Sequence, residues 1–194
     1  MSKTINKLEI SHLTKRFGEK TLFEDLDLTL TAPAVLWAPS GWGKTTLLRI
    51  LMGLDTPTAG WVRGVGRAAA VFQEDRLCPQ LTALQNVTLV LPSSEKQYKE
   101  QIEVDFQQFG MDAAALALPA ARLSGGQKRR TALLRALLCR DARTLLLDEP
   151  FTGMDAELVE DAVAATKRLA GERPTILVTH DRTAADLLGW PVRE

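Results

Sequence analysis

The spacing of hydrophobic positions changes several times along the chain, and each change predicts a different element. Residues 26–30 alternate apolar and polar side chains, which is typical of a half-buried strand. Residues 34–37, 144–148 and 175–179 are nearly continuous apolar runs, which are typical of buried strands in a parallel sheet. Helices are predicted between these runs, at 47–52, 156–170 and 181–188. This order of elements predicts an α/β fold with a mostly parallel sheet.

Two other parts of the chain follow different patterns. The N-terminal part, with strands at 8–11, 13–17 and 26–30 and a turn at 18–20, predicts an antiparallel β part. Residues 61–63 and 68–72 predict two further short strands.

From about residue 80 to 140 the pattern is helical. Thr82 and Gln85 resemble a capping box that opens a short helix, and further helices are predicted at 95–109 and 112–116. We therefore expect one domain over residues 1–194, with a core of about 1–73 and 141–194 and an inserted helical subdomain of about 74–140.

Composition narrows the class of partner. The 24 Lys and Arg residues balance the 24 Asp and Glu residues, so a strongly basic surface is not indicated and no nucleic acid is expected as a partner. We find no signal-peptide segment, and no window of roughly 18 apolar residues that could span a bilayer. Cys78 and Cys139 make neither a disulfide framework nor a metal site, and we expect reduced thiols in or near the core. A cytosolic protein is predicted, which would serve a membrane only through a partner.

The segment 38–46 carries the first functional signal, because it joins a predicted strand to a predicted helix through a glycine-containing loop. Gly41 and Gly43 let successive N–H groups converge on a phosphate at the helix N-terminus. Lys44 adds a positive charge for the β- and γ-phosphates, and Thr45 offers a hydroxyl to Mg²⁺. Ala38 stands where the usual pattern has Gly, and we expect it to be tolerated because the important amides lie later in the loop. The alternative interpretation is a glycine-rich turn before an ordinary helix.

A second helix start, at 123–127, predicts a separate anion site. Ser124 and Gln127 form a capping box, while Gly125 and Gly126 leave N–H groups exposed at the positive end of the helix dipole. Because the net charge is zero, a solvated or ion-paired face is favoured over nucleic-acid binding for the basic residues that follow, which are Lys128, Arg129, Arg130, Arg135 and Arg140.

Polar residues stand at the ends of the predicted strands. Asp148 and Glu149 follow a buried strand, where Asp148 suits Mg²⁺ and Glu149 suits a base or a water-orienting group. His180 ends the next buried strand, where a structural and a catalytic role are equally favoured. Gln73 indicates little alone, and Phe17 is by position alone a core aromatic residue.

Together, these motifs closely resemble the nucleotide-binding subunit of ATP-binding cassette (ABC) transporters. The resemblance covers nearly the whole chain, and the signature at 123–127 is its most specific element. Residues 53–60 and 81–87 look like the importer branch of the family. The other matching segments are 38–46, 71–74, 145–150 and 178–181.

The resemblance implies a role for each matching residue. Phe17 would stack on adenine, and the loop that binds ATP would comprise Ala38, Pro39, Ser40, Gly41, Trp42, Gly43, Lys44, Thr45 and Thr46. Thr45 and Gln73 would bind Mg²⁺, with Asp148 behind them, and Gln73 would also couple nucleotide state to the helical subdomain. Glu149 would be the general base, and His180 would sense the γ-phosphate. Asp155 would lie in the loop that crosses to the partner subunit, whose ATP would be contacted by Leu123, Ser124, Gly125, Gly126 and Gln127.

The same resemblance implies an ATPase that pairs head to tail, with an identical copy or with another cassette, around two ATP molecules. It would energise a membrane transporter by docking a permease near Gln73 and the helical subdomain, with a substrate-binding protein as an optional further partner. Its location would be cytoplasmic, peripheral on the inner face of the cell membrane. The permease would choose the substrate.

Two alternatives remain open within the family. A soluble member would act on DNA, the ribosome or Fe–S assembly, but the chain lacks the second cassette, coiled-coil insertion and zinc motifs that many of those carry. A degenerate cassette without hydrolysis is disfavoured because Lys44, Asp148, Glu149 and His180 are all present.

Overall fold

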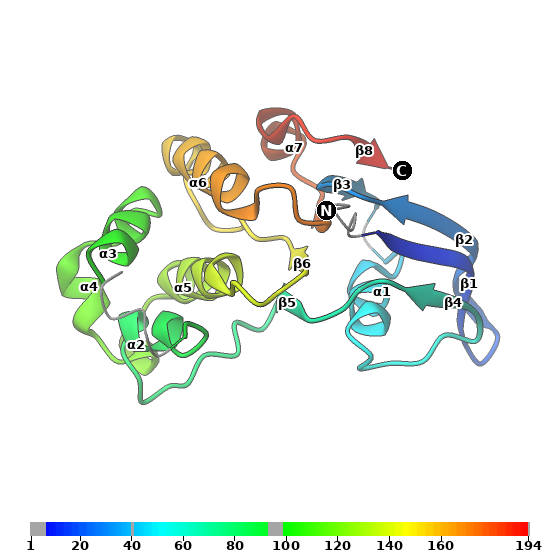
Figure 1. Cartoon of the computed structure of the whole chain (residues 1–194), viewed down its shortest axis with the longest axis horizontal. Coiled ribbons are helices and arrows are strands. Elements are labelled where there is room, and N and C mark those ends of the chain that lie inside the picture. Colours follow the sequence, from blue (N-terminus) through cyan, green and yellow to red (C-terminus); the bar gives the residue numbers. More distant parts are fainter. Residues whose placement is uncertain (1–6, 40, 93–98, 194) are drawn as a thin grey trace, which may run out of the picture.

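We analysed a computed structural model of the chain, which describes residues 7–39, 41–92 and 99–193. In order, its elements are β1 (Leu8–Phe17), β2 (Lys20–Leu30), β3 (Ala34–Trp37), α1 (Lys44–Leu51), β4 (Ala59–Arg63), β5 (Ala68–Val71), α2 (Ala83–Thr88), α3 (Lys99–Gln108), α4 (Ala113–Ala117), the 3-10 turn η2 (Ala120–Arg122), α5 (Gly125–Leu138), β6 (Thr144–Asp148), α6 (Ala156–Ala170), β7 (Thr175–Thr179), α7 (Arg182–Leu188) and β8 (Val192–Arg193). The described chain begins with three strands, has several consecutive helices between β5 and β6, and alternates strands and helices from β6 to β8 (Figure 1).

The strands form two sheets, as the sequence predicted. A five-stranded sheet in the order β5-β6-β7-β3-β8 is parallel throughout, and a three-stranded sheet in the order β2-β1-β4 is antiparallel. The α/β fold class is therefore confirmed. Two details differ from expectation: residues 8–17 form one irregular strand, in which His12 has a φ of 50°, and β8 pairs with β3 although its two residues carry too little pattern to predict a strand.

The parallel sheet is buried on both faces, which explains its continuous apolar runs. Every residue of β6 and β7 is buried. Successive side chains point to opposite faces of the sheet, so Leu145 and Leu147 pack in the cluster that includes α5, α6 and α7. Leu146 packs on the other face, in the cluster that includes α1 and the antiparallel sheet. The ends of β6 and β7 are thereby held rigidly between two layers.

Helices α2 to α5 follow one another between β5 and β6, and α2, α3 and α4 gather at one end of the molecule (Figure 1). Both predicted capping boxes are present: Thr82 with Gln85 begins α2, and Ser124 with Gln127 begins α5. The predicted start of α3 falls partly in 93–98, outside the described residues. The division of the chain into a core and a helical subdomain stays a prediction.

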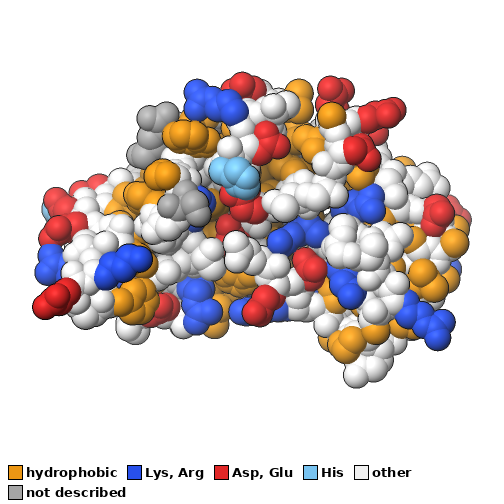
Figure 2. Space-filling model, turned by 180° about the vertical axis from the view of Figure 1, so that it is seen from behind, with side chains coloured by type: hydrophobic (Ala, Val, Ile, Leu, Met, Phe, Trp, Pro, Cys, Tyr) orange, Lys and Arg blue, Asp and Glu red, His pale blue; other side chains and the backbone are white. Residues whose placement is uncertain are grey.

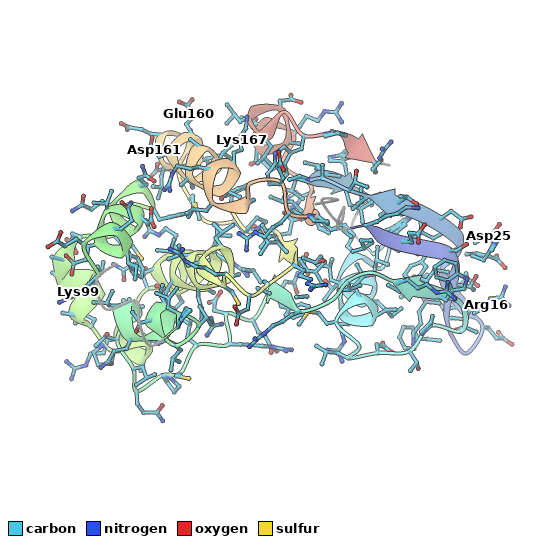
Figure 3. All side chains as sticks on the ribbon, in the orientation of Figure 1. Arg16, Asp25, Lys99, Glu160, Asp161 and Lys167 are labelled. Carbon is cyan, nitrogen blue, oxygen red and sulfur yellow. The ribbon has the colours of Figure 1, made fainter. Side chains whose placement is uncertain are left out.

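The surface carries both signs of charge. Acidic and basic side chains are interspersed over the rear face of the molecule (Figure 2), and labelled residues such as Arg16 and Glu160 lie at the periphery (Figure 3). Both cysteines are free, but Cys78 is exposed, so its expected place in or near the core is wrong. None of the helices in the described part of the chain is long and apolar enough to cross a membrane.

Candidate active site

The predicted phosphate loop connects β3 to α1 and depends on two glycines. Gly41 and Gly43 have φ values of 83° and 105°, a region that favours glycine. A Cβ atom on Gly43 would also lie 3.2 Å from side-chain atoms of Leu22 and Phe23. Gly43 is the N-cap of α1 without any side-chain cap, so the first N–H groups of this helix face the loop.

The lysine of this loop is held by the loop itself. The Lys44 ammonium donates to the carbonyl oxygens of Ala38 (2.6 Å) and Pro39 (3.1 Å). Ala38 is buried and does not have a positive φ, so its backbone needs no glycine, which agrees with the expected tolerance of this departure. Ser40 lies outside the described residues. The Trp42 ring stacks on Phe23 with 5.4 Å between centroids, which fixes the loop against β2.

Asp148 lies at the end of β6 and faces α1. The Thr45 hydroxyl donates to its Oδ2 over 2.6 Å. Burial raises the pKa of the Asp148 carboxyl above its ordinary value and nearby Glu149 adds to this, while the Thr45 hydrogen bond and the charges of Lys44 and Arg129 oppose it. The site therefore holds a carboxylate that burial disfavours, and a cation placed beside it would stabilise the ionised form.

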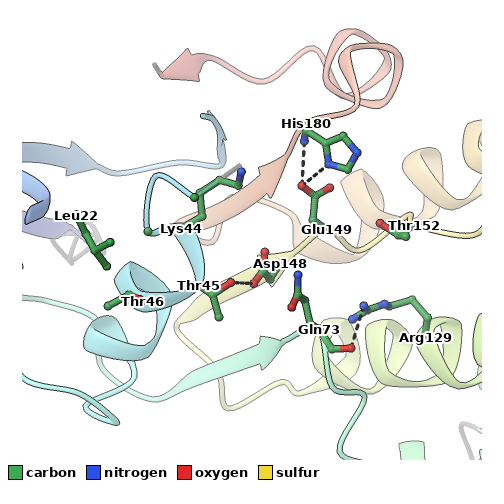
Figure 4. Close-up of a pocket in the computed structure, with 12 residues that line it drawn as sticks. Leu22, Lys44, Thr45, Thr46, Gln73, Arg129, Asp148, Glu149, Thr152 and His180 are labelled. Carbon is green, nitrogen blue, oxygen red and sulfur yellow. Dashed lines mark hydrogen bonds and ion pairs between the residues drawn. The ribbon is translucent and has the colours of Figure 1, made fainter. Parts of the chain in front are cut away.

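Glu149 turns away from Asp148 because its backbone is left-handed. Its φ is 48°, a conformation that a residue other than glycine adopts at a cost of about 1–3 kcal/mol and that often marks a functional site. The turn aims the carboxylate at the end of β7. There Oε1 accepts from the His180 backbone N–H (3.0 Å) and lies 2.6 Å from His180 Nδ1 (Figure 4). Oε2 accepts from the Thr179 hydroxyl (3.0 Å).

These groups converge on one pocket of about 540 Å³ (Figure 4). Nine of the predicted site residues line it: Gly41, Gly43, Lys44, Thr45, Thr46, Gln73, Asp148, Glu149 and His180. Three residues that sequence reasoning did not place there also line it: Leu22, Arg129 and Thr152. Thr152 follows Glu149 by three residues, which was a usable signal. No signal in the sequence placed Leu22 at the pocket, because its position there depends on how the antiparallel sheet packs on the phosphate loop.

Other predicted site residues lie outside this lining. Phe17 is 52% exposed at the end of β1, with the Lys15 ammonium 4.5 Å from its ring centroid. The signature residues 123–127 begin α5, where Ser124 Oγ accepts from the Gln127 N–H and leaves the mouth of the helix on the surface. Asp155 caps α6, accepting from the Leu158 N–H over 2.9 Å. Their predicted roles toward ATP and a partner stay predictions.

The basic residues of α5 meet the expected ion-paired face only in part: Arg129 Nη1 lies 3.6 Å from Asp75 Oδ1, but contacts with the main chain are more numerous. Arg129, Arg130 and Arg135 each donate to main-chain carbonyl oxygens of other segments. Arg129 alone among them lines the pocket. These side chains therefore hold the structure together around the site.

The donor set of the pocket fits a small, hard cation. The Thr45 hydroxyl and the Asp148 carboxylate lie within hydrogen-bond distance of each other, and Gln73 lines the same pocket. Hydroxyl, amide and carboxylate oxygens are the ligands that Mg²⁺ takes in phosphate sites. Together with the glycine loop and Lys44, the arrangement suits a nucleotide with its metal.

Comparisons with known proteins agree with this geometry. The sequence profile of the ABC transporter family matches residues 24–152. The chain is 42% identical to an aliphatic sulfonates import ATP-binding protein of Nocardia farcinica over 184 residues, covering 90% of this chain and 71% of that protein. It is 36% identical to an Fe(3+) ions import ATP-binding protein of Brucella abortus over 193 residues, covering 90% of this chain and 54% of that protein.

Solved structures give the same result. A dimeric bacterial ABC transporter cassette superposes with a TM-score of 0.78 at 25% identity, covering 93% of this chain and 90% of that one. The same cassette is also known in a post-hydrolysis state with ADP and phosphate. The described chain spans between 53% and 75% of the length of the import proteins compared with it. The chain belongs to the ABC transporter family, as one of its ATP-binding, ATP-hydrolysing subunits.

Proposed function

We propose that this chain energises a membrane importer by binding two ATP molecules between two cassettes and hydrolysing them. The observation that carries the proposal is the convergence of Lys44, the Thr45–Asp148 pair and the Glu149–His180 pair on one pocket. A phosphate-binding lysine, a metal-binding pair and a base held by a second side chain are the parts that phosphoryl transfer to water requires.

Each residue has a defined task in this proposal. Lys44 and the N–H groups at the start of α1 bind and orient the phosphates. Thr45, Gln73 and Asp148 would hold Mg²⁺, which would neutralise negative charge on the phosphates. Glu149 takes the proton of the attacking water, and its two donors at β7 fix the direction of the carboxylate. His180, joined to Glu149 at 2.6 Å and open to the pocket, contacts the γ-phosphate.

The chain needs a second cassette to complete this site. Ser124 and Gly125 are exposed at the start of α5, Leu123 before them is buried, and none of residues 123–127 lines the chain's own pocket. We propose that Ser124 and the N–H groups of Gly125 and Gly126 contact the ATP bound by the partner, and that Asp155 lies in the segment crossing to it. A two-fold arrangement of identical copies then gives two equivalent ATP sites at one interface.

We further propose that a permease docks near Gln73 and helices α2 to α5. A nucleotide-dependent movement at Gln73 would then be transmitted directly to the permease. The relatives are named for different cargoes, aliphatic sulfonates and Fe(3+) ions, so we place the choice of cargo in the permease and in any substrate-binding protein. The cassette would then lie on the cytoplasmic face of the cell membrane.

The Glu149→Gln variant tests the proposal. Because glutamine has the same shape, its amide oxygen can keep the His180 N–H donor while the base is lost, and we expect turnover to fall by about 10²–10⁴-fold with ATP binding retained. With ATP and Mg²⁺ the variant should form a stable dimer, measured by light scattering after gel filtration. The matched control is the E149Q/K44A double variant, which should stay monomeric.

The same variant identifies the partner. Tagged E149Q is purified with ATP and Mg²⁺ from detergent-solubilised membranes of the native host. A polytopic membrane protein at stoichiometric yield would support the importer. Recovery of ribosomal, DNA-repair or cluster-assembly proteins without a membrane protein would instead favour a soluble ATPase of the same family.

A further inference from the structure

Arg129 connects the helix that starts at the signature to the segment that contains Gln73. It lies on α5, five residues after Ser124, and its side chain is 12% exposed. Its Nη1 donates to the Phe72 carbonyl and its Nη2 to the Gln73 carbonyl, the latter over 3.1 Å (Figure 4). A planar guanidinium that holds two successive carbonyls fixes their direction as well as their distance.

The carbonyls that Arg129 holds lie just after the C-terminal end of β5. β5 is the edge strand, and its pairing with β6 ends at Val71 and Leu147. Phe72 and Gln73 therefore leave the sheet without a neighbouring strand to orient them. The fork of Arg129 takes over this task at the residue whose side chain lines the pocket.

The Arg129 side chain is not held in place by a hydrogen bond to Asp75. The nearest approach between Arg129 Nη1 and the Asp75 carboxylate is 3.6 Å, and Asp75 Oδ1 is buried without a hydrogen bond. The shorter contacts of Arg129 all go to main-chain oxygens. The guanidinium also lines the pocket, where its charge lowers the pKa of Asp148 against the effect of burial.

Arg135 provides a comparison on the same helix. It donates to the carbonyl oxygens of Arg76 (3.0 Å) and Asp75 (3.1 Å), so it holds the next part of the same segment to α5. It does not line the pocket. The two arginines thus make similar attachments, but only one of them acts at Gln73.

We propose that Arg129 is a positioning residue for both ATP sites of the cassette dimer. In the ATP site of its own chain, Arg129 orients Gln73 toward Thr45 and Asp148, with which Gln73 would hold Mg²⁺. Because it stands on α5, it also ties that orientation to the N-terminus of the same helix, which contacts the partner's ATP. This inference rests on the proposed two-ATP dimer. It adds Arg129 as the residue that couples one ATP site to the other.

The test compares Arg129→Met with Arg135→Met in an otherwise native chain. With R129M, Lys44 and the phosphate loop are intact, so the dissociation constant for ATP should change less than about threefold. We expect kcat to fall by about tenfold to a hundredfold, as misplacement of a positioning group does, the Mg²⁺ concentration for half-maximal rate to rise, and the Hill coefficient for ATP to approach one. R129K should recover part of the Mg²⁺ affinity, since it can satisfy one of the two carbonyls.

R135M should lower the thermal midpoint and leave the Mg²⁺ requirement and the Hill coefficient as in the native chain. Removing Arg129 takes away the cation nearest the partly buried Asp75 carboxylate and leaves Lys128 and Arg135 near it. R129M/D75N is therefore measured as well, which keeps the test valid if R129M folds poorly. Dimer formation in the E149Q background separates the two proposals. If E149Q itself does not dimerise with ATP, the proposed function fails. If E149Q dimerises, and R129M/D75N keeps native Mg²⁺ dependence and cooperativity, the role of Arg129 is refuted.

Discussion

Replacing Asp148 by Asn should make the nucleotide-free protein more stable while removing its function. Asp148 is 2% exposed, and burial is the largest influence on its carboxyl, outweighing the Thr45 hydrogen bond and the charges of Lys44 and Arg129. An aspartate whose pKa is raised on folding is a destabilising group wherever it is ionised in both states. Asn keeps the acceptor for the Thr45 hydroxyl and presents its amide to the pocket, so it removes the charge without leaving the hydroxyl unpaired.

We expect D148N to raise the free energy of unfolding by about 1 kcal/mol at pH 7. This magnitude is typical of single substitutions, but most of those lower the free energy of unfolding. For a domain of this size, that corresponds to about 2–4 °C in thermal midpoint. The sign of the pH dependence follows from the raised pKa: the folded state binds the proton more tightly, so the native protein gains stability as pH falls through the folded-state pKa of Asp148. The advantage of D148N is therefore full at neutral pH and vanishes in acid.

The assay is urea unfolding of both proteins at pH 7 and at a series of lower pH values, without nucleotide or divalent ions. Adding Mg²⁺ and ATP should reverse the order, because only the native chain would gain from binding. An unchanged or lower unfolding free energy for D148N at pH 7, or a gain that persists undiminished in acid, would refute the argument that burial dominates at this carboxyl.

Three further predictions follow from single positions. Lys44→Ala should weaken ATP binding by about tenfold to a hundredfold, the worth of a charge-assisted hydrogen bond, in calorimetric titrations where K167A on the exposed face of α6 binds normally. Leu146→Ala, at a fully buried position, should cost about 2–5 kcal/mol in urea unfolding, whereas L54A at a half-exposed position should cost under about 0.5 kcal/mol; equal losses would contradict the assignment of the core. Phe17→Ala should weaken ATP binding by about two- to tenfold and leave inorganic triphosphate unaffected, while F17Y keeps native affinity; a matching loss for triphosphate would show that no stacking on the base occurs.

Sequence reasoning reached the fold because the informative patterns are local. The continuous apolar runs of β6 and β7 require burial on both faces, which only a covered sheet provides. The capping boxes at Thr82 and Ser124 involve residues three apart, so they can be read without a tertiary structure. The same holds for the loop around Gly41 and Gly43, whose positive φ values suit the residue that adopts them most readily.

What sequence reasoning missed depends on contacts between distant segments. Arg129 contacts Gln73, which lies 56 positions earlier in the sequence. Other arginines on the same helix have different partners, and the sequence does not distinguish them from Arg129. Leu22 reaches the pocket only through the packing of the antiparallel sheet on the phosphate loop. The left-handed backbone of Glu149 is also invisible in the sequence, because a positive φ is usual for glycine and not for glutamate.

The contacts inside the pocket separate groups that would exchange partners on binding ATP from groups that would keep them. Lys44 is held by two neutral carbonyls, which are weaker partners for an ammonium than a phosphate, so exchanging them for ATP is favourable. Thr45 is held by Asp148, a carboxylate that burial already disfavours and that a metal ion would stabilise. Glu149, in contrast, is held by two donors from the end of β7 and by its own constrained backbone. The groups proposed to bind phosphate and metal are thus positioned to change partners, while Glu149, the proposed base, is oriented before the substrate arrives and need not be reorganised during the reaction.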